Sequence, residues 1–189
     1  DEIDKDLFDL GRINFLNSEQ DIILNYCAYK YLCKGNFDYY LTDISKVPML
    51  TDDANKNREQ RYVNWFGLLK EELDYFGYLK SNVSIISIGN AVDKFLRSNG
   101  LEPSLNIIHY SWSASSHIIE YFNNNSLNYN AFEESKNNII DFMKEIYQVN
   151  NIFEKERKTK RNFSSHVSEW KKMLFSVYKY EFEKLASKK

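Results

Sequence analysis

Apolar and polar positions alternate with two different periods along the chain, and the alternation predicts helices separated by strands. Three short runs are apolar or β-branched and end in a small or polar residue, as is typical of strands: residues 39–44, 83–88 and 105–108. Around them, apolar residues recur every three or four positions, as is typical of amphipathic helices. Helices are therefore expected over residues 18–34, 58–76, 91–98 and 115–122.

The order of these elements predicts an α/β fold of three αβα layers with a short central parallel sheet. Helices 58–76 and 91–98 would pack on that sheet, because helices that connect parallel strands cover its faces. In helix 58–76, Lys70, Glu71 and Glu72 are expected to face outward. After residue 125 the strand pattern stops, and two amphipathic helices follow over residues 132–147 and 164–185. We therefore expect an α/β domain over residues 1–125 and a helical C-terminal extension over residues 126–189, packed on it.

Composition favours a packed globule, because aromatic residues make up 16% of the chain while glycine and proline are scarce. The net charge is −2, so a surface that binds nucleic acid would have to be a local basic patch. The charged segment 155–161 is a candidate for such a patch, although most charged runs are solvated faces. No apolar run reaches the roughly 18 residues of a membrane span, so no membrane partner is expected.

Cysteine and histidine spacing argues against a metal or a cofactor. Cys27 and Cys33 lie six positions apart, which is neither a same-face helical pair nor a C-x-x-C motif, so both are expected to be free thiols in a reducing compartment, the cytoplasm. No set of cysteines could hold an iron–sulfur cluster. His117 and His166 have no ligand partners at metal spacing. No G-x-G-x-x-G motif indicates a nucleotide cofactor.

Candidate chemistry lies where the predicted strands end. Asp43, Gly89 and His109 each stand at or near the carboxyl end of one strand, and such ends meet at one edge of a parallel sheet. We therefore expect the three residues to line one cleft. Each also has a purely structural interpretation. His109 would then be a hydrogen-bonded core histidine, and Asp43 would cap the next turn through an Asx interaction.

The order of three motifs resembles that of the uracil-DNA glycosylase superfamily over residues 20–120. The motifs are Leu41-Thr42-Asp43-Ile44-Ser45-Lys46, the glycine-terminated strand at 85–91 and His109-Tyr110-Ser111. The resemblance implies a DNA glycosylase that extrudes a base into a pocket between the strand ends and hydrolyses the N-glycosidic bond. DNA, single or double stranded, would be its partner.

The same resemblance implies a role for each candidate residue. His109 would stabilise the charge that develops on the departing base, while Asp43 and Gly89 would contact that base. Trp112 would act as a wedge or stacking group. The residues that contact DNA would be Lys46, Ser111, Trp112 and Ser113. Lys46 could instead be a solvated lysine, and the two serines could cap the following helix.

Three departures from the superfamily pattern keep alternative functions open. Asp43 stands where the superfamily has an asparagine, and an ionised carboxylate accepts hydrogen bonds but donates none. Tyr110 replaces a proline, so the backbone there is less restricted. Residues 1–9 are acidic but lack the glycine-rich turn that would direct a carboxylate at water, so that motif either precedes residue 1 or has been lost. The alternatives are a catalytically silent module that binds nucleic acid, or a protein partner through its C-terminal helices, and an unrelated Rossmann-like enzyme.

Overall fold

The computed structural model describes residues 15–16, 18–46, 56–77, 83–149 and 167–188, and most of these are helical. The chain divides into two compact units. The helical unit combines Asp1–Tyr39 with Tyr110–Lys189, and the sheet unit comprises Tyr40–His109. This division differs from the predicted boundary at residue 125, because helices from both ends of the chain pack together in the helical unit.

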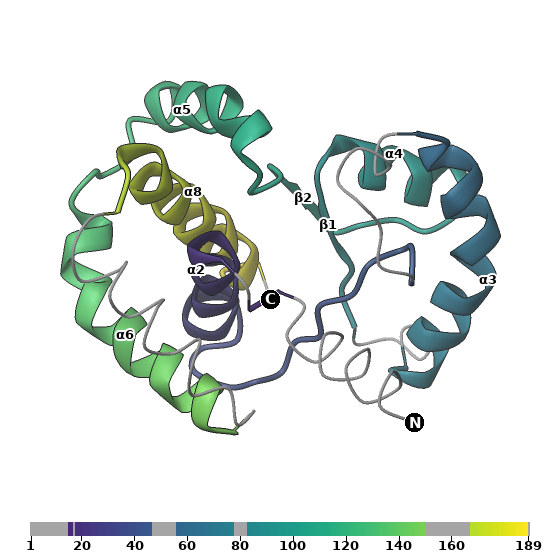
Figure 1. Ribbon diagram of the computed structural model, residues 1–189, viewed down its shortest axis with the longest axis horizontal. Helices are drawn as coiled ribbons and strands as arrows, with labels where there is room; N and C mark the ends of the chain where they lie inside the picture. Colours follow the sequence, from purple (N-terminus) through teal and green to yellow (C-terminus); the bar gives the residue numbers. More distant parts are fainter. Residues whose placement is uncertain (1–14, 17, 47–55, 78–82, 150–166, 189) are drawn as a thin grey trace, which may run out of the picture. The chain divides into compact units, whose positions relative to one another are not determined.

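The helical unit is built around helix α8, which contacts the three other long helices of this unit (Figure 1). These elements are α2 (Glu19–Cys27), α5 (Ser115–Asn124), α6 (Ala131–Val149) and α8 (Glu169–Ala186). Ser18 caps α2 through a reciprocal pair of hydrogen bonds with Asp21. The helix continues into a π-helical turn, Ala28–Leu32, and Gly35, with a φ of +89°, follows its end. The predicted helix 18–34 is therefore confirmed.

Aromatic side chains fill the core of the helical unit. The ring of Phe175 on α8 lies 5.7 Å from that of Phe132 on α6 and 6.1 Å from that of Tyr26 on α2. Leu174 and Tyr178 of the same helix are also fully buried. The apolar stripes from which these helices were predicted thus face one common core. Helix 132–147 is confirmed, and helix 164–185 is confirmed from Glu169 onward, while residues 164–166 lie outside the described part of the chain.

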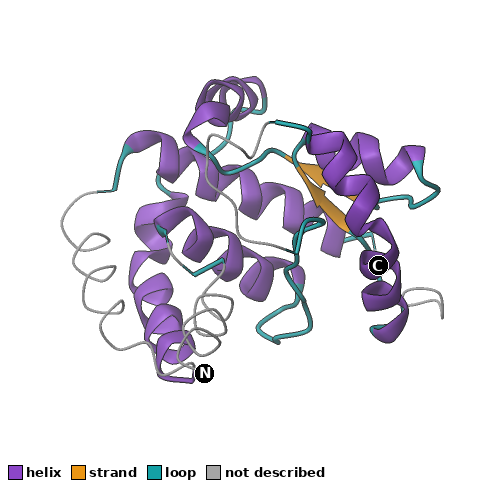
Figure 2. Ribbon diagram, turned by 45° about the vertical axis from the view of Figure 1, so that its right-hand side comes forward, coloured by secondary structure: helices purple, strands orange, loops and turns teal. Residues whose placement is uncertain are grey.

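The sheet unit contains the two strands of the described residues, which lie side by side in Figure 2. Strand β1 (Ile86–Ile88) pairs in parallel with β2 (Leu105–Ile107), with Ser87 opposite Asn106. Helix α4 (Asn90–Ser98) connects them and contacts β1. Backbone hydrogen bonds from Ser104 to Ile85 and from Gly89 to Ile107 extend the pairing at both ends. Predicted strand 105–108 is therefore confirmed, predicted strand 83–88 is confirmed only over residues 86–88, and the two pair in the predicted direction.

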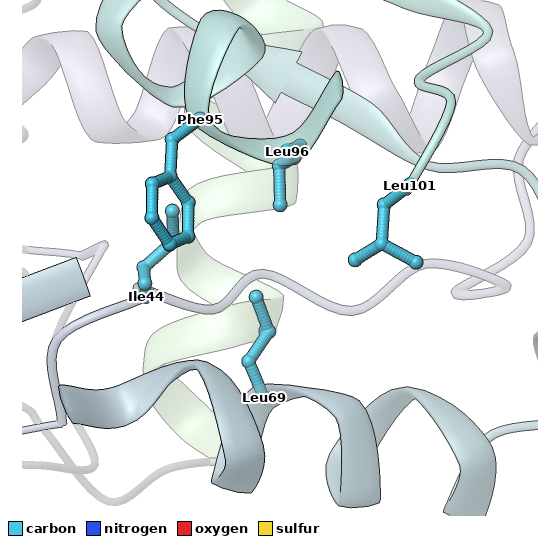
Figure 3. Close-up of a cluster of buried hydrophobic side chains, with 5 residues drawn as sticks. All are labelled: Ile44, Leu69, Phe95, Leu96 and Leu101. Carbon is cyan, nitrogen blue, oxygen red and sulfur yellow. The ribbon is translucent and has the colours of Figure 1, made fainter. Parts of the chain in front are cut away.

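A small apolar core holds helix α3 (Arg58–Tyr75) in the sheet unit. Leu69 is the buried residue that α3 contributes, and Tyr62, Phe66 and Leu73 pack around it. Ile44 reaches this core from the segment that precedes α3 along the chain (Figure 3). The buried members of the cluster are Ile44, Leu69, Phe95, Leu96 and Leu101.

The predicted strand 39–44 is wrong, because this segment carries no strand pairing and bends at Ile44 and Ser45. It also crosses the division between the two units, which falls after Tyr39. Its residues are held by side chains instead of by a ladder of backbone hydrogen bonds. The Tyr39 hydroxyl donates to Asn25 Oδ1 at 3.0 Å, and Ile44 is buried among apolar side chains. An apolar alternating run is therefore anchored here without a neighbouring strand.

Candidate functional site

The carboxyl ends of the two strands bring Gly89 and His109 together. Gly89 follows β1 directly, has φ +91° and ψ 148°, and donates its N–H to the Ile107 carbonyl at 2.8 Å. A Cβ atom added to Gly89 would lie 3.2 Å from the Cβ of His109 and 3.5 Å from its Cδ2. His109 is exposed, so it is not the core histidine of the structural interpretation. Gly89 and His109 therefore lie together at the strand ends, and the cleft that would also include Asp43 remains a prediction.

A hydrogen-bonded network around Ser87 ties α4 to both strands. Ser87, at 1% exposure, places its Oγ 2.8 Å from Asp93 Oδ1 and 3.2 Å from Asn106 Oδ1. Asp93 also accepts from Arg97 Nε at 2.9 Å, and this bond is the main reason that the pKa of Asp93 lies below its ordinary value. Sequence reasoning missed the network, although a serine inside an apolar strand pattern is a signal for it. The network fixes the backbone from which Gly89 and His109 extend.

Asp43 belongs to the same unit and is exposed. Burial raises the pKa of Tyr62 on α3, while the charges of Arg58 and Arg61 lower this pKa and that of Asp43 raises it. The carboxylate of Asp43 is thus one of three charges that act on the Tyr62 hydroxyl. Its contact with a base remains a prediction.

Lys46 is paired with Glu72 of α3. Its ammonium lies 2.5 Å from Glu72 Oε2, and the two side chains are 18% and 19% exposed. The same ammonium donates to the Thr42 hydroxyl, while the Tyr40 hydroxyl donates to Glu72 Oε1 at 2.7 Å. Burial raises the pKa of Glu72, but the hydrogen bonds and the charge of Lys46 outweigh it, so this pKa lies below its ordinary value. Lys46 is thus not a solvated lysine, and a phosphate bound to it would have to share it with Glu72.

Ser111, Trp112 and Ser113 belong to the helical unit and form a turn before α5. The hydroxyls of Ser111 and Ser113 lie 2.8 Å apart, and Ser111 makes no capping hydrogen bond with its side chain. Trp112 is 68% exposed. Its ring lies edge-on to that of buried Trp170, with centroids 5.5 Å apart. The ring of Trp170 therefore supports part of the indole, while much of the Trp112 surface is open to solvent.

The remaining candidates give no further site in the described part of the chain. The basic segment 155–161 and His166 lie outside the described residues. His117 is exposed on α5, 4.0 Å from Glu120 Oε2. Neither Cys27 nor Cys33 forms a disulfide, and burial raises the pKa of the Cys27 thiol. Among the described residues, no group of three or more His, Cys, Asp or Glu side chains is arranged to hold a metal ion.

Comparison with known proteins identifies no relative of this chain. The chain matches no protein-family model, no curated protein and no solved structure. Within the described residues, no helix combines the length and the apolar character that crossing a membrane requires. The function must therefore be argued from the residues of this chain alone.

Proposed function

We propose that the chain is a divergent uracil-DNA glycosylase-like protein that excises a base from DNA by hydrolysis of the N-glycosidic bond. The observation that carries the proposal is the exposed His109 lying against Gly89 at the carboxyl end of a parallel strand pair. Parallel sheets commonly present their chemistry at this edge. The three-layer αβα architecture belongs to this proposal, as does a cytoplasmic location, which suits two cysteines that form no disulfide.

The proposed chemistry assigns one role to His109. When the bond between C1′ and the base nitrogen breaks, its electron pair leaves with the base. The oxygen of a water molecule bonds to C1′, and the proton that this water loses ends on the departed base. An imidazole N–H donated to the base oxygen would stabilise the negative charge that develops there. An exposed ring on a short connection between a strand and a helix can reach a base that has been turned out of the DNA stack.

Asp43 is the residue that we propose for base selection. An ionised carboxylate accepts hydrogen bonds and would repel the carbonyl oxygen on the uracil edge. It suits an edge with two N–H donors, such as that of guanine. We therefore expect weak or absent cleavage of uracil by the natural sequence, and higher cleavage after Asp43→Asn, which restores a donor to the base edge.

One assay tests these roles. Uracil-containing single and double strands would be incubated with the natural sequence, with Asp43→Asn, and with His109→Ala and His117→Ala in the Asp43→Asn background. His109→Ala should lower kcat by about 100-fold while changing DNA affinity little, because its contact strengthens only as charge develops. His117→Ala is the matched control, since His117 is exposed on α5. Equal, measurable cleavage by all four proteins would reject both assigned roles.

The second candidate function is a catalytically silent module that binds nucleic acid. One observation favours it: Trp112 offers an open aromatic surface. Aromatic side chains bind single strands by stacking on bases, whatever the sequence. Absence of cleavage by every variant, together with retained DNA binding, would support this function over the first.

Trp112→Ala is expected to weaken binding of a single-stranded oligonucleotide by roughly 5- to 150-fold, because each stacked base contributes about 1–3 kcal/mol. Fluorescence anisotropy with a labelled oligonucleotide would measure the change. Tyr75→Ala is the control, since Tyr75 is an exposed aromatic residue of the other unit. Equal affinity of the natural sequence and Trp112→Ala would remove Trp112 from the binding surface.

A further inference from the structure

Glu72 gathers side chains from both sides of Asp43 onto one carboxylate. Tyr40 and Thr42 precede Asp43 along the chain, and Lys46 follows it. The Tyr40 hydroxyl donates to Oε1 at 2.7 Å, and the Thr42 hydroxyl lies 3.1 Å from Oε2. The Lys46 ammonium pairs with Oε2 and also donates to the Thr42 hydroxyl. Glu72 therefore joins three points of a seven-residue segment to helix α3.

We propose that Glu72 is a positioning residue that fixes the course of residues 40–46 and thereby holds Asp43 in place. The part of this inference that concerns base selection rests on the proposed function. The fixing of the segment does not, because it can be measured without DNA.

Residues 40–46 need such an anchor because they have no strand pairing to order them. Ordering a backbone costs roughly 1–2 kcal/mol per residue in conformational entropy. Thr42 is tied to Glu72, and Ile44 is buried in the apolar core of the sheet unit (Figure 3). Asp43 lies between these two anchors and is itself exposed. Its backbone is thus fixed on both sides while its carboxylate stays accessible.

The opposite charges of Lys46 and Glu72 strengthen this role. Less than a fifth of each side chain in the Lys46–Glu72 pair is exposed, so solvent screens their attraction less than it screens a surface pair. Removing the carboxylate would leave the partly buried Lys46 ammonium without this partner, which is costly. Residues 40–46 should then loosen while the strand pair, which has its own backbone hydrogen bonds, should keep its order.

The test compares substitutions of Glu72 and of its partner Tyr40 with two matched controls. Glu72→Gln removes the charge and Tyr40→Phe removes one hydroxyl. Their controls are Glu71→Gln and Tyr75→Phe, which alter the same groups at exposed positions of α3 that have no hydrogen-bond or ion-pair partner among the described residues. Hydrogen exchange of the backbone amides and the ¹³C signal of the Asp43 carboxyl carbon would be measured in the full chain.

We expect Glu72→Gln to speed amide exchange in residues 40–46 by about tenfold or more, as local opening becomes easier, and to shift the Asp43 signal. Tyr40→Phe should give a smaller change of the same kind. Exchange in β1, α4 and β2 should stay unchanged, and both controls should behave like the natural sequence. Unchanged exchange in residues 40–46 and an unmoved Asp43 signal in Glu72→Gln would overturn the proposal.

A conservative replacement and a kinetic measurement separate positioning from general stability. Lys46→Met should speed exchange in residues 40–46, whereas Lys46→Arg, which keeps the ion pair, should restore slow exchange. In the Asp43→Asn background, Glu72→Gln should raise KM for a uracil-containing strand more than it lowers kcat, because a base contact present in both the bound state and the transition state is weakened. If no variant cleaves uracil, the proposed function fails while the exchange and ¹³C results still decide the role of Glu72.

Discussion

Phe175→Ala is expected to lower the free energy of unfolding by about 3–5 kcal/mol, the usual cost of truncating a buried phenylalanine. Phe175 is completely buried on α8. Its ring contacts those of Tyr26, Tyr31 and Phe132, with centroids 5.7–6.1 Å apart. Alanine would therefore leave a cavity at the point where α2, α6 and α8 meet.

Urea unfolding followed by circular dichroism would measure this loss. Glu183→Ala is the control, because Glu183 is exposed on the same helix, and surface substitutions usually change stability by less than about 0.5 kcal/mol. A loss below about 1 kcal/mol for Phe175→Ala would be too small for a fully packed ring. Such a small loss would contradict the role of the aromatic core in holding the helical unit together.

The long helices were predictable because their evidence is local. The apolar residues of α6 and α8 recur with the helical period, so each sequence segment shows which of its faces will be buried. The structure buries Phe132, Ile139 and Met143 of α6 as that period predicts. What the period cannot give is the partner of each face. The division of the chain into units therefore differs from the predicted boundary at residue 125.

The failed strand shows the limit of period-two patterns. In residues 39–44 the apolar positions indicate burial correctly for Ile44. They do not indicate whether a second strand is available for pairing, and a strand requires such a ladder of backbone bonds. The side chains of Thr42 and Lys46 reach the Glu72 carboxylate instead.

One part of the candidate site could be predicted from the sequence and another part could not. Gly89 and His109 could be paired from sequence, because both follow strands and parallel strands end at one edge. The Lys46–Glu72 pair could not, since the residues are 26 positions apart and Glu72 was expected on the outer face of its helix. The contact between Lys46 and Glu72 depends on how residues 40–46 pack against α3, and no periodic pattern in the sequence encodes that packing.

Gly89→Ala is expected to destabilise the sheet unit and displace His109. With φ +91° and ψ 148°, Gly89 occupies a region that is almost restricted to glycine, where other residues cost about 1–3 kcal/mol. The added methyl group would also lie 3.2 Å from the His109 Cβ, closer than ordinary carbon contacts of about 3.5–4.0 Å. We expect the total loss to exceed that from backbone strain alone.

Gly100→Ala separates the two causes. Gly100 has a φ of +79°, and a Cβ added there meets no described heavy atom within 4 Å, so this variant carries backbone strain without a side-chain collision. Gly89→Ala should therefore cost more than Gly100→Ala in urea unfolding. His109→Gly removes the colliding Cβ, so Gly89→Ala should be less harmful in that background, with a coupling energy of about 0.5–3 kcal/mol for residues in contact. Strict additivity of the two substitutions would show that Gly89 does not hold His109 through this contact, and the strand-end pair that carries the proposed function would lose its physical basis.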